Sequence, residues 1–446
     1  MPQDLIVRGG TCVTATESFS ADVLLLAGRI AALLAPGAPV DPAIPALDAR
    51  GCHVLPGCFD VHVHFREPGL EHKEDFLTGS AGAALGGVTC VFDMPNTKPP
   101  VATAAAVREK WERLAGRSWV DYGFYGVVLP DNLPEMEGMA AAGVIGFKIF
   151  AGPTTGNLPA PNWGQMIEVF RTAVRLDRPI ALHAEDREVV EYWTAQVRAA
   201  GGSSYEDLLA SRPDFSEAAC IAMATLLAEQ AGSRLHIVHV NTAEGAAMVA
   251  AARARGVRVT AETCPPYLFL TREDYLRLGN VMKILPLVRE QSDQAALWRA
   301  LVSGTIDCVS TDHAPHLPAE KAGDVWSAAA GAPGVETMLP LLLTALHAGR
   351  FGLQDLVRMT SLRPAQIYGL YPRKGSLQVG ADGDLSIVDL KAPGVVDAAR
   401  LQTKAKQSPF DGWKLHGLPV ATVVRGAVVA QEGALLGSPL GAPVRP

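Results

Sequence analysis

The feature that most constrains the fold is a rhythm of short apolar runs separated by stretches with helical character. The runs are rich in Val, Ile, Leu and Phe, whereas the stretches between them are rich in Ala, Leu, Arg and Glu. Strands that alternate with helices pair in parallel, so the pattern predicts an α/β fold. Eight such strands predict a (β/α)8 TIM barrel, whose chemistry lies at the strand carboxyl ends. The predicted strands cover residues 59–64, 89–94, 120–129, 146–150, 179–183, 235–240, 257–263 and 306–311.

The two ends of the chain lack this rhythm. Residues 1–56 and 371–446 contain short Val- and Leu-rich runs punctuated by Gly-Gly, Ala-Gly and Pro-Gly turns. We therefore divide the chain into a β-rich segment 1–56, a barrel 57–370 and a second β-rich segment 371–446. A length of 446 residues suits a large barrel with one smaller domain.

Composition excludes several classes of protein. The net charge is −7 with no basic stripe, which argues against nucleic-acid binding. The sequence contains no apolar run of about 20 residues and no leader pattern, so we expect neither membrane insertion nor export. The seven cysteines include no Cys-x-x-Cys pair, which argues against a disulfide framework and a thiolate zinc site. We expect a protein of the reducing cytoplasm.

A His-x-His pair ends the first predicted strand. Side chains two apart on a strand point to the same face, so His62 and His64 project together. Two histidines that line a core would be the simpler interpretation. Their position at a strand end, followed by Arg66 and a Pro-Gly break, favours half of a metal site.

Ionisable residues also end other predicted strands. Lys148 lies in the fourth, His183 ends the fifth, His239 lies near the end of the sixth and Asp312 follows the eighth. Because these ends meet at one face of a barrel, we expect the side chains to converge there.

Several motifs together resemble one family. The runs HVHFREPG (62–69), DMPNT (93–97) and GTIDCVSTDHAPH (304–316) are similar to dihydroorotase. The runs GFKIF (146–150), ASRPDFSE (210–217) and AETCPPYL (261–268) are more similar to allantoinase and hydantoinase. Nearly the whole chain resembles the cyclic amidohydrolases. The resemblance implies that segments 1–56 and 371–446 pair into one β-sandwich, and we expect a homo-oligomer, either a dimer or a tetramer.

The resemblance also implies a site for two metal ions, which we expect to be Zn²⁺ because imidazole and oxygen ligands prevail. An ammonium group cannot bind a cation, but in this family the lysine reacts with CO₂ to give a bridging carbamate. The alternative for Lys148 is a side chain with its head in solvent. Asp312 would act first as base and then as acid, and His313 would support its loop. The implied metal ligands are His62, His64, Lys148, His183, His239 and Asp312.

Three residues bear on the choice of substrate. In dihydroorotases the residues that correspond to Arg66, Asn96 and His316 hold the substrate carboxylate, which favours interconversion of L-dihydroorotate and N-carbamoyl-L-aspartate in pyrimidine biosynthesis. Alternatively, Arg66 pairs with a local acid such as Glu67. Leu285 departs from the dihydroorotase pattern, so allantoinase, hydantoinase or dihydropyrimidinase is the alternative.

A remote alternative is an inactive dihydroorotase-like scaffold, which the complete set of expected ligands disfavours. His236 is expected to have no role beyond packing or the surface.

Overall fold

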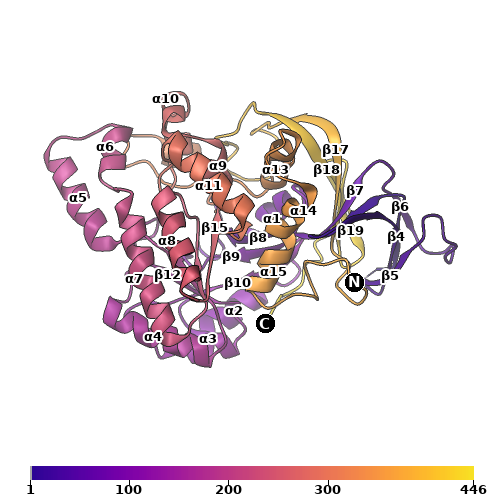
Figure 1. Ribbon diagram of the computed structural model, residues 1–446, viewed down its shortest axis with the longest axis horizontal. Coiled ribbons are helices and arrows are strands. Elements are labelled where there is room, and N and C mark those ends of the chain that lie inside the picture. Colours follow the sequence, from indigo (N-terminus) through magenta and orange to yellow (C-terminus); the bar gives the residue numbers. More distant parts are fainter. Residues whose placement is uncertain (1–2, 446) are drawn as a thin grey trace.

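The computed structural model describes residues 3–445 and has a central set of parallel strands surrounded by helices, with two further sheets at one end (Figure 1). The parallel strands lie close to the predicted positions, but the predicted strand 120–129 is interrupted at Tyr125 and divides into β10 and β11. The central strands are β8 (Cys58–Val63), β9 (Val88–Asp93), β10 (Asp121–Phe124), β11 (Gly126–Val127), β12 (Phe147–Phe150), β13 (Ile180–His183), β14 (Leu235–Ile237), β15 (Val259–Thr263) and β16 (Cys308–Val309).

These strands follow one another in sequence order. One sheet has the order β10-β9-β8 and the next has the order β11-β12-β13-β14-β15-β16, all in parallel pairs. The first and last positions also meet, because the backbone N–H of His64 donates to the carbonyl of His313 at 2.7 Å. A parallel bridge joins Val63 to the same residue. The carboxyl ends of all these strands therefore face one region.

The helices between the strands bury apolar faces against them, and several begin at side-chain caps. Asp75, Thr103, Asn162 and Thr242 each accept a hydrogen bond from a backbone N–H of the first turn. The α-helices are α1 (Phe76–Leu85), α2 (Ala104–Leu114), α3 (Glu135–Ala141), α4 (Trp163–Arg175), α5 (Arg187–Ala199), α6 (Tyr205–Ala210), α7 (Phe215–Ala231), α8 (Ala243–Ala254), α9 (Pro265–Phe269), α10 (Tyr275–Leu278), α11 (Gln291–Ser303), α12 (Pro318–Lys321), α13 (Met338–His347), α14 (Leu353–Val357) and α15 (Arg363–Ile367).

The two ends of the chain pair with each other, as the resemblance implied. One sheet has the order β5-β4-β1-β6, and a seven-stranded sheet has the order β20-β19-β18-β17-β7-β2-β3. In the latter, β7 pairs antiparallel with β17, which places Val54 opposite Ile387. The strands are β1 (Leu5–Arg8), β2 (Thr11–Val13), β3 (Ser18–Ser20), β4 (Asp22–Leu26), β5 (Arg29–Leu34), β6 (Ala46–Asp48), β7 (His53–Pro56), β17 (Leu385–Val395), β18 (Lys414–Val424), β19 (Ala427–Gln431) and β20 (Ala434–Leu435).

A buried ion cluster ties this region to the parallel strands. The Lys374 ammonium lies 2.7 Å from Asp121 on β10 and 2.5 Å from Asp384 just before β17. The backbone N–H of Gly57, immediately before β8, donates to the carbonyl of Asp384. These contacts fix where the first parallel strand begins. Within residues 3–445, no helix is long and apolar enough to cross a membrane.

Candidate active site

Six predicted ligands line one pocket at the carboxyl ends of the parallel strands. The pocket encloses about 380 Å³ including its open mouth. His62 lies on β8 and His64 directly after it, whereas Lys148 lies on β12. The other lining residues are Arg66, Asn96, Phe150, Thr154, Thr155, His183, His239, Leu285, Asp312, Ala314, Ala330 and Gly331.

The ring nitrogens of the histidines point toward shared positions. Asp312 Oδ1 lies 2.9 Å from His64 Nε2 and 3.3 Å from His62 Nε2. On the other side of the pocket, His183 Nδ1 lies 2.9 Å from His239 Nε2. Asp312 and His239 both have left-handed backbone conformations, with φ of 49° and 42°. Non-glycine residues rarely adopt this conformation, and it is concentrated at functional sites.

Burial sets the charge of these groups. It lowers the pKa of His64 to about 4, although the neighbouring Asp312 carboxylate acts in the opposite direction. Burial likewise lowers the pKa of His183 and of His239. Burial alone would raise the pKa of Asp312, but His62 and His64 hold it below its ordinary value. The pocket therefore combines neutral imidazoles with a carboxylate, which are the forms that bind metal ions.

Lys148 is fully buried, and its Nζ has no hydrogen-bond partner in the part of the chain that the structure describes. Its head does not reach solvent, so the snorkelling alternative is wrong. Burial lowers the pKa of its amine to about 8, although Glu262 and Asp312 oppose this shift. His239 Nδ1 also lacks a partner among residues 3–445. Buried polar atoms are nearly always satisfied, so the orphaned Lys148 Nζ is consistent with a site in which the six residues hold cations. His239 faces His183 through Nε2 and not through its orphaned Nδ1.

Glu262 and Glu185 support the candidate ligands, and the sequence analysis missed both. Glu262 Oε1 lies 2.6 Å from His62 Nδ1, and Glu185 Oε2 lies 3.0 Å from His183 Nε2. Arg212 in turn contacts both oxygens of Glu185. The signal in the sequence was a charged residue inside or directly after an apolar run: Glu262 lies in run 257–263 and Glu185 follows run 179–183.

The three predicted carboxylate-binding residues have different surroundings. Arg66 lines the pocket, and within residues 3–445 its side chain forms hydrogen bonds only with the carbonyl of Pro315 and the ring of His316. Glu67 instead accepts from the backbone of Phe76 and lies near Arg117. The alternative that Arg66 pairs with Glu67 is therefore wrong.

Asn96 and His316 are already engaged by protein groups. Asn96 Oδ1 lies 2.7 Å from His64 Nδ1, and its amide nitrogen donates to the carbonyl of Thr155. His316 lies behind Arg66, where its Nε2 is 3.2 Å from Arg66 Nη2 and 3.1 Å from the carbonyl of Ala330. Burial and the charges of Arg66 and Lys73 lower the pKa of His316 to about 2, so this ring is neutral.

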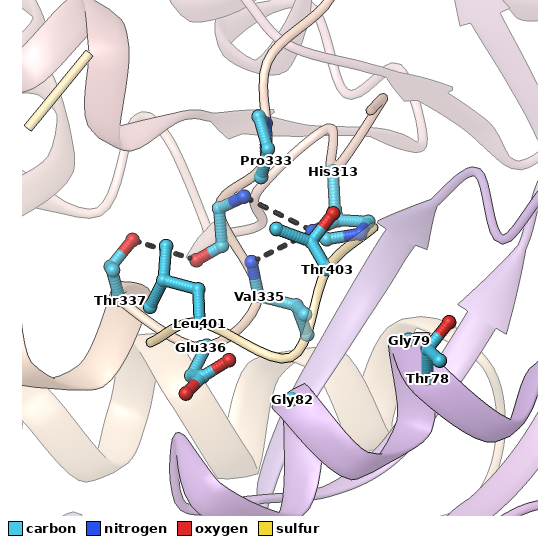
Figure 2. Close-up of a pocket in the computed structure, with 11 residues that line it drawn as sticks. Thr78, Gly79, Gly82, His313, Pro333, Val335, Glu336, Thr337, Leu401 and Thr403 are labelled. Atoms are coloured by element: carbon cyan, nitrogen blue, oxygen red, sulfur yellow. Dashed lines mark hydrogen bonds between the residues drawn. The ribbon is translucent and has the colours of Figure 1, made fainter. Parts of the chain in front are cut away.

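His313 supports the loop that carries Asp312, as expected. Its Nδ1 accepts hydrogen bonds from the backbone N–H groups of Gly334 and Val335, at 3.1 and 3.2 Å. Figure 2 shows this ring above a small pocket beside α1, with Thr337 bonded to the carbonyl of Gly334. The His313 ring thus anchors the loop of Asp312 to Gly334 and Val335, which follow Gly331 of the pocket lining.

Comparison with known proteins agrees with this geometry. A profile described as "Amidohydrolase family" matches residues 53–429. A solved structure, "L-Hydantoinase (Dihydropyrimidinase) from Arthrobacter aurescens", superposes with a TM-score of 0.96 at 37% identity and full coverage of both chains. An allantoinase of Deinococcus radiodurans is 38% identical over 100% of this chain and 99% of its own. A dihydroorotase of Geobacter sp. strain M21 is 37% identical over 96% of this chain and 100% of its own. The chain belongs to the amidohydrolase family.

Proposed function

We propose that this protein is a (β/α)8-barrel enzyme that hydrolyses a ring amide of a cyclic ureide, in the manner of a hydantoinase or allantoinase. The observation that carries the proposal is the convergence of six ligand groups on one pocket, with the buried amine of Lys148 left without a partner among residues 3–445. The barrel would comprise residues 57–370, and segments 1–56 and 371–446 would form the sandwich.

Two Zn²⁺ ions would be held by these residues, one by His62 and His64 with Asp312, and the other by His183 and His239. An amine with a pKa near 8 is partly uncharged at neutral pH and can react with CO₂, releasing a proton and leaving the carbamate that would join the two ions. Bound in this way, the ions supply an activated water and polarise the carbonyl under attack.

Asp312 is placed to move the proton. Its carboxylate lies beside His62 and His64 and is held in the anionic form, so it can accept a proton from the attacking water. An amide nitrogen leaves poorly until it is protonated. Asp312 therefore returns the proton to the ring nitrogen as the C–N bond breaks, and serves as base and then acid.

The lining of the pocket favours a hydantoinase or allantoinase. The sequence alone had favoured dihydroorotase. Phe150 and Leu285 contribute apolar groups to the pocket lining, which suit a neutral ring with an apolar substituent. Asn96 already binds His64 through its oxygen and Thr155 through its nitrogen, which leaves one N–H for a substrate. The TM-score of 0.96 with the solved hydantoinase supports the same class of substrate.

One observation keeps dihydroorotase as a second candidate. Arg66 is buried and faces the pocket with only neutral partners in the described chain. An unpaired buried guanidinium is costly, and a substrate carboxylate would satisfy it bidentately.

A substrate panel tests both candidates. We expect the Zn²⁺-loaded protein to turn over allantoin or 5-substituted hydantoins faster than dihydrouracil or dihydroorotate. A preference for dihydroorotate would select the second candidate. Failure on every ring, with both ions bound, would contradict the proposal.

A further inference from the structure

Within residues 3–445, the side chain of His236 forms hydrogen bonds with Thr260 and Glu262, neither of which we assign as a metal ligand. It belongs to β14, is fully buried, and points to the side of the strand opposite Ile237. Its Nε2 lies 3.1 Å from Glu262 Oε2, while the other oxygen of Glu262 lies 2.6 Å from His62 Nδ1. One carboxylate thus joins a candidate metal ligand to a second histidine that the proposed mechanism does not use.

The chain of contacts continues away from the pocket. His236 Nδ1 lies 2.9 Å from Thr260 Oγ1, and Thr260 lines a separate pocket with Arg234, Arg258 and Arg363. Each side chain in the series has a polar partner on both sides. This continuity indicates that His236, itself held by Thr260, fixes the orientation of the Glu262 carboxylate together with His62.

A carboxylate has no proton to donate, so each ring nitrogen that it contacts must supply one. If His62 Nδ1 carries its proton toward Glu262, the lone pair of the neutral ring is on Nε2. This is the nitrogen that lies 3.3 Å from Asp312 in the pocket. An acceptor behind a metal-binding histidine fixes both its ring orientation and its tautomer.

We propose that His236 is a positioning residue, which holds Glu262 so that His62 presents Nε2 to a cation. This inference rests on the proposed metal site but not on the identity of the substrate. It predicts that the ion held by His62 and His64 depends on His236, whereas the ion held by His183 and His239 does not.

The test compares apo protein of the wild type with Glu262→Gln, His236→Leu and His236→Gln. The matched control is His347→Leu, an exposed histidine on α13. Metal affinity is measured by competition with a chelator. The ligand field is measured separately, from the visible absorption of the Co²⁺-loaded protein. Melting temperature and circular dichroism report on folding.

We expect Glu262→Gln to weaken binding of the ion held by His62 and His64 by about 10- to 100-fold. The new amide can present N–H groups to His62 and favour the wrong tautomer. His236→Leu should weaken binding of the same ion and alter the Co²⁺ spectrum. His236→Gln should restore much of the affinity, since its amide can donate to Glu262. The control should bind both ions as the wild type does.

Thr260→Val provides a second test if His236→Leu does not fold. It leaves every ring in place but removes the hydroxyl that contacts His236, so a smaller weakening of the same ion is expected. Wild-type affinity and spectrum in Glu262→Gln and Thr260→Val would overturn the inference. An equal loss of both ions would also overturn it, because the role would then be structural. A wild type that binds no metal would instead contradict the proposed site itself.

Discussion

Arg212 contacts both carboxylate oxygens of Glu185, with Nε 3.0 Å from Oε1 and Nη2 2.6 Å from Oε2. The same Nη2 donates to the carbonyl of Pro153 at 2.5 Å, and Glu185 lies 3.0 Å from His183. This buried pair therefore joins a candidate metal ligand to the loop that carries Thr154 and Thr155 over the pocket.

Arg212→Met should destabilise the protein because it leaves the Glu185 charge buried and unpaired. Loss of one partner of a buried ion pair costs about 3–5 kcal/mol of unfolding free energy. The double variant Arg212→Met, Glu185→Gln removes that charge and should recover part of the loss. Urea denaturation of the two single variants and the double variant measures this. Additive losses would show that the pair is not coupled.

Lys148→Ala should lose most of the bound metal and activity, because it removes the group proposed to join the two ions. Added formate or acetate should restore part of both, since a short carboxylate can occupy the vacated space. Metal per chain is measured by elemental analysis, with and without the carboxylate. Full occupancy of untreated Lys148→Ala would exclude the bridging role.

Asp312→Asn should lower kcat by about 10²- to 10⁴-fold, because the amide can neither accept nor return the proton. The fold and at least part of the metal content should persist, since four histidines and Lys148 remain. Turnover is measured on whichever ring the wild type prefers. A kcat near the wild-type value would remove Asp312 from the proton transfer.

Arg66→Met separates an anion-binding role from a structural one. A charge-assisted hydrogen bond contributes about 1.5–3 kcal/mol, which corresponds to a loss of roughly ten- to a hundred-fold in kcat/KM for dihydroorotate. An uncharged ring such as dihydrouracil should be nearly unaffected. The control is Arg117→Met, which lies outside the pocket lining. An equal loss on both rings would mean that Arg66 is structural.

Glu336 should make stability depend on pH. Burial raises the pKa of its carboxyl to about 7, although a hydrogen bond from Gln402 opposes the shift. The folded state therefore retains a proton that the unfolded chain has released, and this contribution is lost as pH rises from about 4.5 through 7. Glu336→Gln removes this titration. The melting temperature of the variant minus that of the wild type should therefore be higher at pH 8 than at pH 5. An identical difference at both pH values would contradict this.

The strand–helix rhythm and the ends of the apolar runs were sufficient to predict most of the fold. A strand has a period of two, so His62 and His64 had to share a face wherever that strand lay. Parallel strands place their carboxyl ends together, which predicted that Lys148, His183 and Asp312 would meet. The pairing of β7 with β17 came from the family resemblance instead, because strand patterns do not identify a partner more than 300 residues away.

Only the tertiary structure decided which groups stand behind the ligands. Glu262 is 200 residues from His62 along the chain, and no local pattern links them. The sequence likewise left Arg66 free to pair with Glu67, until the fold directed Glu67 toward Phe76 and Arg117. Periodicity fixes the face on which a side chain lies, whereas the neighbour that it meets depends on strand order and register. The sequence by itself therefore determined which ionisable side chains lie at the strand ends, and the packing decided how those side chains are oriented.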